Sequence, residues 1–233
     1  MLPVLVLCGG RGTRLQAVTG GDTPKALVNV AGRPFIDHKL ANLRDAGLEE
    51  VVLSVGFGGD RIRAHVGDGG ALGVHVRYVD DGPCLRGTGG AVLAARPELP
   101  DTFWVTYGDS LLELDVGAAE ATFRAQALPA LMVVLHNRDR WGVSNALVRG
   151  ERVVAYGKDP VPPGAEHIDY GMLVLTRALL ESPDRPTSFD LALVLAAAAD
   201  AGQLAAHEAD SPFHDIGTPE DLRATDAFLR GRT

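Results

Sequence analysis

The chain has 233 residues with an ordinary share of hydrophobic (46%) and charged (22%) side chains, and its formal net charge is −8. This length allows one large α/β domain with a substantial core, or at most two small ones. The acidic balance argues against nucleic acid or an anionic membrane as the main partner, because binding to a phosphate backbone needs a basic face.

The first predicted element is a buried strand at residues 3–7, which runs directly into a glycine-rich basic loop. Its apolar run is too short for a helix. The loop, residues 8–15, reads Cys-Gly-Gly-Arg-Gly-Thr-Arg-Leu, and a Thr-Pro-Lys segment ending at Lys25 follows. Glycines let the backbone approach a ligand closely and point successive N–H groups at an anion. With the further cations Arg11 and Arg14, the segment predicts a clamp for a nucleoside triphosphate.

Two common phosphate-binding motifs do not match this loop. The P-loop requires a lysine directly after its last glycine, and no lysine stands in that register. The dinucleotide fingerprint Gly-x-Gly-x-x-Gly requires a third glycine where the chain has Leu15. The alternative is a strand–turn–helix connection whose glycines serve only geometry, and the Pro24-Lys25 pair disfavours it.

Helix and strand signals alternate through the rest of the first half. In chain order they predict a helix over 34–46, a strand over 51–55, a short helix around 62–66, a strand over 74–79, a helix over 91–96 opened by the glycines of 87–90, and a strand over 103–107. Strands separated by helices in this way are typical of βαβ units and a largely parallel sheet.

The second half is more mixed. It predicts strands over 131–136, 146–148, 152–156 and 172–175, a helix over 189–201, and a helix that begins after Thr218 with a capping box. Some of these strands are expected to be antiparallel with hairpin-like links. No linker or repeat divides the chain, so we expect one domain over 1–233. About 1–115 would form its nucleotide-binding half and about 116–233 its sugar-binding half.

Ligands of an open parallel sheet bind outside the carboxyl ends of its strands. The loop after the first strand, the glycines at 87–90 and the Gly-Asp at 108–109 all lie at such ends. We therefore expect them to converge on one crevice. The glycines at 87–90 also place backbone N–H groups at a helix start, where they can donate hydrogen bonds to an anion or to the edge of a base. A tight turn with close packing is the alternative there.

Two aspartates are the candidates for holding Mg²⁺. Asp109 follows a predicted buried strand, and Asp215 lies in a short apolar segment that meets a helix cap. Mg²⁺ in phosphoryl transfer is held by one or two carboxylates together with phosphate oxygens. A lone aspartate at a strand end is often only a turn or capping residue. The pair, in a chain with this glycine-rich loop, favours a metal site.

These motifs resemble, over essentially the whole chain, those of the sugar-1-phosphate nucleotidylyltransferases. The similarity rests on Gly-Gly-x-Gly-Thr-Arg-Leu with the later Pro-Lys, on Gly-Thr-Gly-Gly-Ala at 87–91, on Gly-Asp at 108–109 and on Asp-Ile-Gly-Thr-Pro-Glu-Asp-Leu at 215–222. The chain looks like the members of the D-glycero-D-manno-heptose 1-phosphate guanylyltransferase type. The resemblance implies a Rossmann-like α/β fold with a mixed, mostly parallel sheet flanked by helices.

The resemblance also implies the reaction. A nucleotidyl group would pass from an NTP to a sugar 1-phosphate, releasing pyrophosphate and giving an NDP-sugar, with GDP-heptose as the first expectation. Arg14 and Lys25 would act on the triphosphate, and Asp109 and Asp215 would hold Mg²⁺. Nucleotide binding is then expected at Leu7, Gly9, Gly10, Gly12, Thr13, Gly87, Thr88 and Gly89.

On the sugar side, the resemblance implies that Lys158 lies near the sugar phosphate and that the backbone of Tyr170 and Gly171 lies beside the sugar. The chain departs from the family there at two points. Gly157-Lys158 stands where the family usually has Glu-Lys, and Asp169 to Gly171 stands where Asn-Ala-Gly is common. The resemblance is therefore a better guide to the nucleotide-binding residues than to the identity of the sugar.

Three other functions are alternatives for this sequence. A glycosyltransferase with a similar core requires an Asp-x-Asp motif, whereas the chain has Asp109-Ser110-Leu111. A non-catalytic nucleotide-sensing module is disfavoured because the cationic and metal-binding residues are kept. A cytidylyltransferase acting on a polyol or choline phosphate would share the N-terminal loop. The base stays open among guanine, uracil, adenine, thymine and cytosine.

The compartment follows from the cysteines and the N-terminus. Cys8 and Cys84 have neither a disulfide framework nor metal-ligand spacing, and the short N-terminal apolar run has no basic region before it. No stretch reaches the length of a membrane span. We expect a cytoplasmic enzyme with NTP and sugar 1-phosphate as partners and with no nucleic acid or membrane partner. Whether it forms a homo-oligomer is left open.

Overall fold

The computed structural model of the chain describes residues 1–15, 20–82, 86–181 and 186–232. Cys84, one of the two cysteines considered above, lies outside these residues. Cys8 is a free, partly buried thiol. Within the described residues, no helix is both long and apolar enough to cross a membrane.

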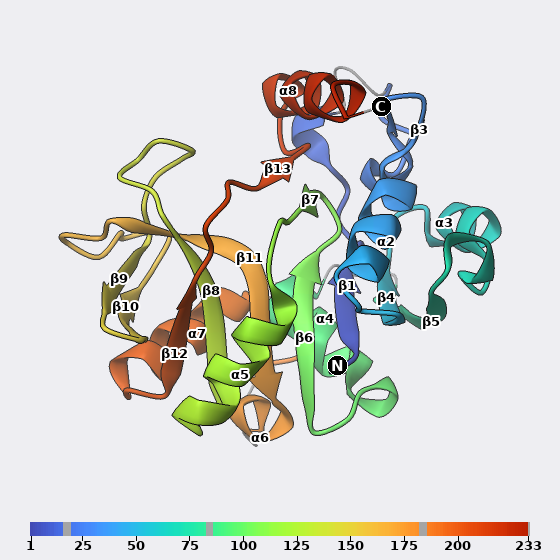
Figure 1. Cartoon of the computed structure of the whole chain (residues 1–233). Helices are drawn as coiled ribbons and strands as arrows, with labels where there is room; N and C mark the ends of the chain where they lie inside the picture. Colours follow the sequence, from blue (N-terminus) through green and yellow to red (C-terminus); the bar gives the residue numbers. More distant parts are fainter. Residues whose placement is uncertain (16–19, 83–85, 182–185, 233) are drawn as a thin grey trace.

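Nine strands of the described chain form one continuous sheet, to which both halves of the sequence contribute (Figure 1). The spatial order is β5-β4-β1-β6-β11-β8-β12-β10-β9. The strands are β1 (Val4–Leu7), β4 (Glu50–Val55), β5 (His75–Asp80), β6 (Thr102–Tyr107), β8 (Ala130–His136), β9 (Ala146–Arg149), β10 (Arg152–Tyr156), β11 (His167–Thr176) and β12 (Leu204–Glu208).

The predicted predominance of parallel pairing is not confirmed, because the sheet is mixed. Strands β5, β4, β1 and β6 are parallel, as expected from their helical crossovers. However, β11 is antiparallel to both β6 and β8, and β10 is antiparallel to β12 and β9. The turn at Gly150 joins β9 to β10, and so short a link can connect only antiparallel strands.

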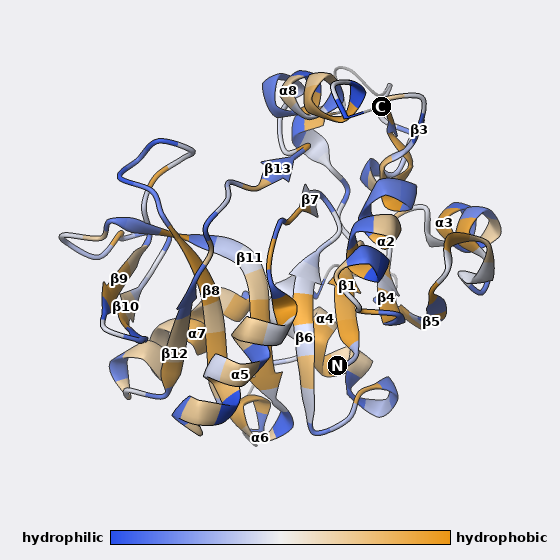
Figure 2. Ribbon diagram, viewed as in Figure 1, coloured by the Kyte–Doolittle hydropathy of each residue, from blue (hydrophilic) through white to orange (hydrophobic). Residues whose placement is uncertain are grey.

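Helices cover both faces of the sheet. Helices α2 (Phe35–Asp45) and α5 (Val116–Gln126) lie on the front face in Figure 1, and α4 (Gly87–Ala95), α6 (Arg177–Leu180) and α7 (Leu191–Asp200) lie behind it. Alternate strand residues feed the two cores: Val4 and Val6 pack with the front helices, and Leu5 packs with those behind. Figure 2 shows the resulting concentration of hydrophobic residues in the central strands.

Smaller elements gather at the carboxyl ends of the parallel strands. Strand β7 (Ser110–Leu111) pairs with β13 (His214–Asp215), and β2 (Asn29–Val30) pairs with β3 (Arg33–Pro34). Helix α8 (Pro219–Arg230) begins with the predicted capping box, formed by Thr218 and Asp221. Helix α3 (Gly59–Val66) and four short 3₁₀ helices complete the described chain: η1 (Thr13–Leu15), η2 (Lys25–Leu27), η3 (Gly70–Leu72) and η4 (Arg96–Glu98).

Candidate active site

A cavity of about 390 Å³ opens at the carboxyl ends of β1 and β6, and we call it the central pocket. Its wall is formed by most of the 7–14 loop, Lys25, the start of α4, the Tyr107–Asp109 segment, Asp81 and Gly217. The size suits a nucleotide-sized ligand. The loop, the α4 start and Gly108-Asp109 thus meet at one crevice, as the strand-end argument predicts.

The glycines of the 7–14 loop differ in what they allow. A Cβ on Gly9 would lie 1.9 Å from the Asp81 Oδ2, so only glycine fits against that carboxylate. Gly10 has open space where a side chain would point, and Gly12 has a φ of +59°. The loop is therefore tightly packed at Gly9 and has unfilled space beside Gly10.

Of the three predicted cations, two line the central pocket. Arg14 and Lys25 belong to its wall, whereas the guanidinium of Arg11 lies 5.6 Å from the centre of the Phe57 ring, outside that wall. Lys25 Nζ donates to Asp109 Oδ2 at 2.6 Å, with the side chains only 15% and 35% exposed. This close, partly buried ion pair places a cation at the end of β6.

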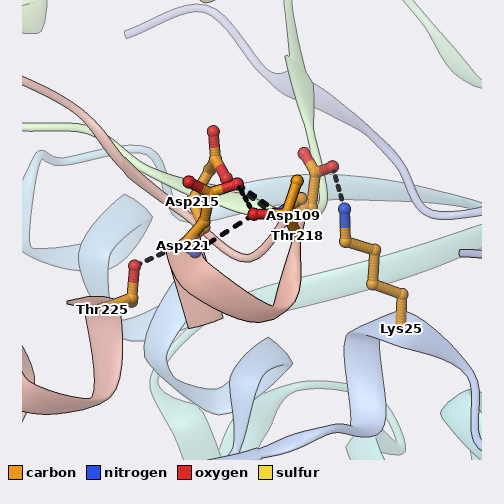
Figure 3. A network of polar contacts seen from close by, with 7 residues as sticks. Lys25, Asp109, Asp215, Thr218, Asp221 and Thr225 are labelled. Carbon is orange, nitrogen blue, oxygen red and sulfur yellow. Dashed lines mark hydrogen bonds and ion pairs between the residues drawn. The ribbon is translucent and has the colours of Figure 1, made fainter. Parts of the chain in front are cut away.

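The second candidate carboxylate is brought to the first by the β7–β13 pairing. Asp215 is the register partner of Ser110, and Ile216 N–H donates to the Asp109 carbonyl at 3.0 Å. Asp215 Oδ1 accepts from Gly217 N–H at 2.7 Å, and Thr225 Oγ1 donates to the Asp215 carbonyl. Figure 3 shows this network and the Lys25–Asp109 pair.

The electrostatics of Asp109 and Asp215 suit a divalent cation. Burial, together with the charges of Asp221 and Asp109, raises the pKa of Asp215. Lys25 can balance the charge of only one of these two carboxylates. The remaining negative charge is one that a metal ion would neutralise. Mg²⁺ takes one or two carboxylates and fills its remaining positions with water and phosphate oxygens, so this donor set fits it. No group of three metal-binding side chains occurs among the described residues.

The glycines at the start of α4 serve packing as well as the pocket. Gly87 and Thr88 line the central pocket. Gly89 N–H donates to the Phe189 carbonyl at 3.0 Å, and a Cβ there would lie 2.1 Å from the Phe189 ring. The donor predicted to face a ligand at Gly89 is thus already engaged. These contacts match the close-packing alternative at Gly89, and nucleotide binding by Gly87, Thr88 and Gly89 stays a prediction.

Lys158 lies among acidic and aromatic groups beside the central pocket, which we call the Lys158 cluster: Tyr107, Tyr156, Lys158, Asp169 and Asp190. Its Nζ lies 6.0 Å from the centre of the Tyr107 ring. Burial raises the pKa of Asp169, and Lys158 counteracts this shift. Asp169 accepts from Gly171 N–H and from Tyr156 O–H, each at 2.9 Å. Because Tyr107 also lines the central pocket, the two regions adjoin.

The two departures from the family pattern have structural counterparts. A Cβ on Gly157 would lie 2.6 Å from the Pro160 carbonyl oxygen, so the turn at this point leaves no room for a side chain. Tyr170 points away from the Lys158 cluster: its hydroxyl bonds the Glu113 backbone, and its ring packs edge-on against Phe213. Gly171 has a φ of +82° and lies against Tyr107.

The sequence reasoning missed three side chains at this site. Lys39 is fully buried, and its Nζ donates to Thr106 Oγ1 at 3.1 Å and to the Ser110 carbonyl at 2.9 Å. Burial lowers the pKa of Lys39 to about 8, although the charge of Asp109 opposes this shift. Thr106 Oγ1 in turn donates to the Gly171 carbonyl at 2.9 Å. The other two are Asp81 and Tyr107; a lysine inside a predicted amphipathic helix was the one available signal.

The fold and the central pocket define a class: α/β proteins that take a ligand at the carboxyl ends of parallel strands. The family is given by a model described as the MobA-like NTP transferase domain, which matches residues 4–155. The chain belongs to this family of nucleotidyltransferases.

Three similar proteins refine the comparison. The chain is 30% identical to mannose-1-phosphate guanylyltransferase of Mycobacterium tuberculosis, over 97% of this chain and 64% of that protein. It is 26% identical to D-glycero-alpha-D-manno-heptose 1-phosphate guanylyltransferase of Campylobacter jejuni, over 94% and 96% respectively. The structure of HddC from Yersinia pseudotuberculosis complexed with GMP-PN matches with a TM-score of 0.81 at 25% identity, over 98% and 100% respectively. The chain spans only part of the length of three curated relatives that it matches, namely 64%, 54% and 51%.

Proposed function

We propose that the chain transfers a nucleotidyl group from an NTP to a sugar 1-phosphate, forming an NDP-sugar and pyrophosphate. The observation that carries this proposal is a glycine-lined pocket with Arg14, Lys25 and Asp109 in its wall. The pairing of β7 with β13 holds the second carboxylate, Asp215, beside the segment that bears Asp109. The names of the relatives agree, since they include guanylyltransferases for mannose 1-phosphate and heptose 1-phosphate.

In the proposed reaction, a phosphate oxygen of the sugar 1-phosphate attacks the α-phosphorus of the NTP in line. The new P–O bond forms as the bond to the β-phosphate breaks, and pyrophosphate takes the electron pair. Both reacting groups are anions, so the protein's main task is to hold negative charges together. Arg14 and Lys25 do this for the triphosphate. The attacking phosphate is already ionised, so no side chain has to abstract a proton.

Mg²⁺ is the proposed metal ion, with Asp109 and Asp215 as its protein ligands. When bound, it would neutralise charge on the phosphate oxygens. Lys25, now paired to Asp109 at 2.6 Å, would then turn its ammonium toward a phosphate oxygen. The chain's own contribution is to fix the two carboxylates, which the β7–β13 pairing and the Gly217 N–H accomplish.

The Lys158 cluster is the proposed sugar-phosphate subsite, with Lys158 on the incoming phosphate and the Gly171 backbone beside the sugar. Asp169, which is partly buried, supplies a carboxylate in this subsite, where Gly157 supplies none. Tyr170 contributes only backbone, because its side chain is directed to Glu113. GDP-heptose is the first expected product, with hexose 1-phosphates as the next substrates.

The alternatives predict different substrates for the same pocket. A cytidylyltransferase would use CTP with a polyol or choline phosphate, and a nucleotide-sensing module would bind without turnover. The retained Lys25, Asp109 and Asp215 favour an enzyme over a sensor. We propose further that 1–233 act as one domain, with 1–115 on the nucleotide side and 116–233 on the sugar side; the shared sheet supports this. A cytoplasmic location and self-association stay predictions.

A panel of five nucleoside triphosphates against heptose, mannose and glucose 1-phosphates, with choline phosphate and a polyol phosphate, tests the proposal by pyrophosphate release. One sugar 1-phosphate with one dominant triphosphate is expected. The matched variant Arg14→Ala should lose about 10²–10³ in kcat, because one preorganised cation is worth that much. Turnover of choline or polyol phosphate alone would favour the cytidylyltransferase, and no turnover at all would leave the sensor.

A further inference from the structure

Tyr170 is a buried side chain of β11 that the proposed reaction does not use. Only 1% of the residue is exposed, and it packs in the core in front of the sheet. The register of β11 on β8 shifts between Asp169 and Leu173, and Gly171 has a φ of +82°. Such an irregularity in a strand re-aims the side chains beside it. Here it directs Tyr170 away from the Lys158 cluster and toward the segments around β7 and β13.

The Tyr170 hydroxyl makes two hydrogen bonds to the backbone of one residue, Glu113. It accepts from the Glu113 N–H and donates to the Glu113 carbonyl, each at 3.1 Å. Burial raises the pKa of Tyr170 to about 12, so the hydroxyl keeps the proton that it donates. Glu113 follows β7, only a few residues after Asp109. The two bonds therefore fix the chain just beyond the first proposed metal ligand.

The Tyr170 ring contacts the segment that bears the second proposed ligand. It packs edge-on against Phe213, with the ring centres 5.8 Å apart and the ring planes at 83°. Phe213 directly precedes β13, which consists of His214 and Asp215. Edge-to-face aromatic pairs have a preferred geometry as well as an apolar contact, so the pair fixes where the chain enters β13.

One side chain thus supports both segments that carry the two carboxylates. The pairing of β7 with β13 involves only two residues of each strand. So short a two-stranded pairing is marginal without further packing, and Tyr170 supplies packing from a third strand. The resemblance leads us to expect alanine at this position, and an alanine side chain would make neither contact. The support is therefore a feature of this chain's own sequence.

We propose that Tyr170 is a positioning residue that sets the separation of Asp109 and Asp215 and thereby the affinity for the divalent cation. The inference rests on the proposed function, because it takes these two carboxylates to be the metal ligands. Mg²⁺ demands near-ideal octahedral geometry, so a small displacement of either carboxylate weakens its binding. Tyr170 acts through the backbone of Glu113 and the ring of Phe213, and it touches neither the metal ion nor a substrate.

The experiment is Mn²⁺ binding to the full chain without nucleotide, followed by electron paramagnetic resonance of the free ion. Mn²⁺ prefers the same carboxylate oxygens as Mg²⁺, and Asp215→Asn should remove most of the binding. Tyr170→Phe keeps the ring and removes the hydroxyl, so it should weaken Mn²⁺ binding about fivefold. Tyr170→Leu removes both contacts and should weaken it about 20-fold. In turnover, Tyr170→Phe should lower kcat and raise the Mg²⁺ requirement, with the KM for the sugar 1-phosphate within about threefold of wild type.

Two controls separate positioning from a general loss of stability. Tyr78→Phe removes a hydroxyl that donates to the Gly67 carbonyl, at the sheet edge formed by β5. Leu180→Ala truncates a buried side chain in the core behind the sheet, and it should lower the stability at least as much as Tyr170→Phe does. Both controls should bind Mn²⁺ as wild type does. Tyr170 variants that lose stability but keep the wild-type Mn²⁺ affinity would show that Tyr170 only fills the core, and would overturn the inference.

If Tyr170→Phe does not fold, Phe213→Leu removes the ring contact from the other side and should weaken Mn²⁺ binding about threefold. An unchanged affinity in that variant, or no Mn²⁺ binding by the wild-type chain, would also overturn the inference. Because the first readout is metal binding, Tyr170-dependent Mn²⁺ affinity without any turnover would refute the proposed reaction and leave this inference standing. Turnover of a sugar 1-phosphate with equal Mn²⁺ affinity in wild type and both Tyr170 variants would do the reverse.

Discussion

The two sides of the site are built by different means. On the proposed nucleotide side, the 7–14 loop and the start of α4 offer mostly backbone, at the ends of parallel strands and at the start of a helix. In the Lys158 cluster, Tyr156 and Asp169 offer side chains from the antiparallel strands β10 and β11, and Lys158 follows β10. Glycine at a strand end is visible in a sequence, whereas a meeting of side chains across strands depends on register. The second kind of site is therefore harder to predict.

The largest effect is expected at the two proposed metal ligands, Asp109 and Asp215. Asp109→Asn and Asp215→Asn should each lower kcat by about 10²–10³ or more, because each removes a charge that holds the metal ion. Pyrophosphate release measured against Mg²⁺ concentration checks this. Asp200→Asn, at the exposed end of α7, is the control. Full activity in EDTA, or an Asp215→Asn variant within about threefold of wild type, would contradict the two-carboxylate model.

Lys39 supports both sides, through Ser110 beside Asp109 and through Thr106 to Gly171. Its folded pKa of about 8 lies below the ordinary 10.5. Between these values the unfolded chain holds a proton that the folded chain has lost, so wild-type stability should rise with pH there. Below pH 8 the charged, buried lysine costs stability. Lys39→Met should therefore be more stable than wild type at pH 7, by up to roughly 3 kcal/mol.

Denaturant unfolding of both proteins at pH 7 and pH 10.5 tests this, and the difference in unfolding free energy should shrink at the higher pH. The same Lys39→Met variant should lose kcat, since the segment bearing Asp109 loses its anchor. A stability difference that is the same at both pH values would refute the assigned pKa. Unchanged kcat would show that Ser110 and Thr106 hold their positions without Lys39.

The two glycine segments of the nucleotide side should respond differently to a methyl group. Gly89→Ala should cost about 1–3 kcal/mol of unfolding free energy, because its Cβ meets the Phe189 ring. Gly10→Ala should stay within about 0.5 kcal/mol, because nothing lies within 4 Å of its Cβ position. It should instead raise the KM for the NTP. If Gly10→Ala destabilised the protein and Gly89→Ala did not, the assignment of packing to Gly89 and ligand contact to Gly10 would be wrong.

The smallest effect is expected in the Lys158 cluster. Asp169→Asn keeps the shape and one carbonyl acceptor for Gly171 N–H, but it removes the charge opposite Lys158. The KM for the sugar 1-phosphate should rise about tenfold, equivalent to about 1.4 kcal/mol. The KM for the NTP should not change. An equal rise in both constants would show that Asp169 shapes the nucleotide side as well.

Much of the fold was predictable, and the reasons differ by region. The strand at β1, helix α2, strands β4 and β6 and the capping box of α8 follow from apolar runs and capping residues. Helix α5 and strand β12 were missed, because the alanine-rich sequences of 116–126 and 204–208 show little periodicity. The mixed pairing was underestimated because β11 is antiparallel to β6 and to β8, and no short link in the sequence joins these strands.

The candidate site was predictable where a motif carries it. Arg14, Lys25, Asp109 and Gly87 all line the central pocket, and Asp215 lies next to Asp109. Asp81 was missed because, unlike Asp109, it belongs to none of the motifs that carry the resemblance. Lys39 was missed because a lysine in an amphipathic helix usually lies on the exposed face. Only the packing around them shows that both are buried.

The pairing of β7 with β13 joins segments from the middle and the far end of the chain. During synthesis, Asp109 emerges long before Asp215, so a growing chain carries the glycine loop and one carboxylate without the other. Contacts of such sequence separation form late in folding, because a long loop must close first. The proposed metal site would therefore be complete only after residues 214–216 had docked. Premature termination anywhere before Asp215 would leave a chain without the second of the two proposed metal ligands.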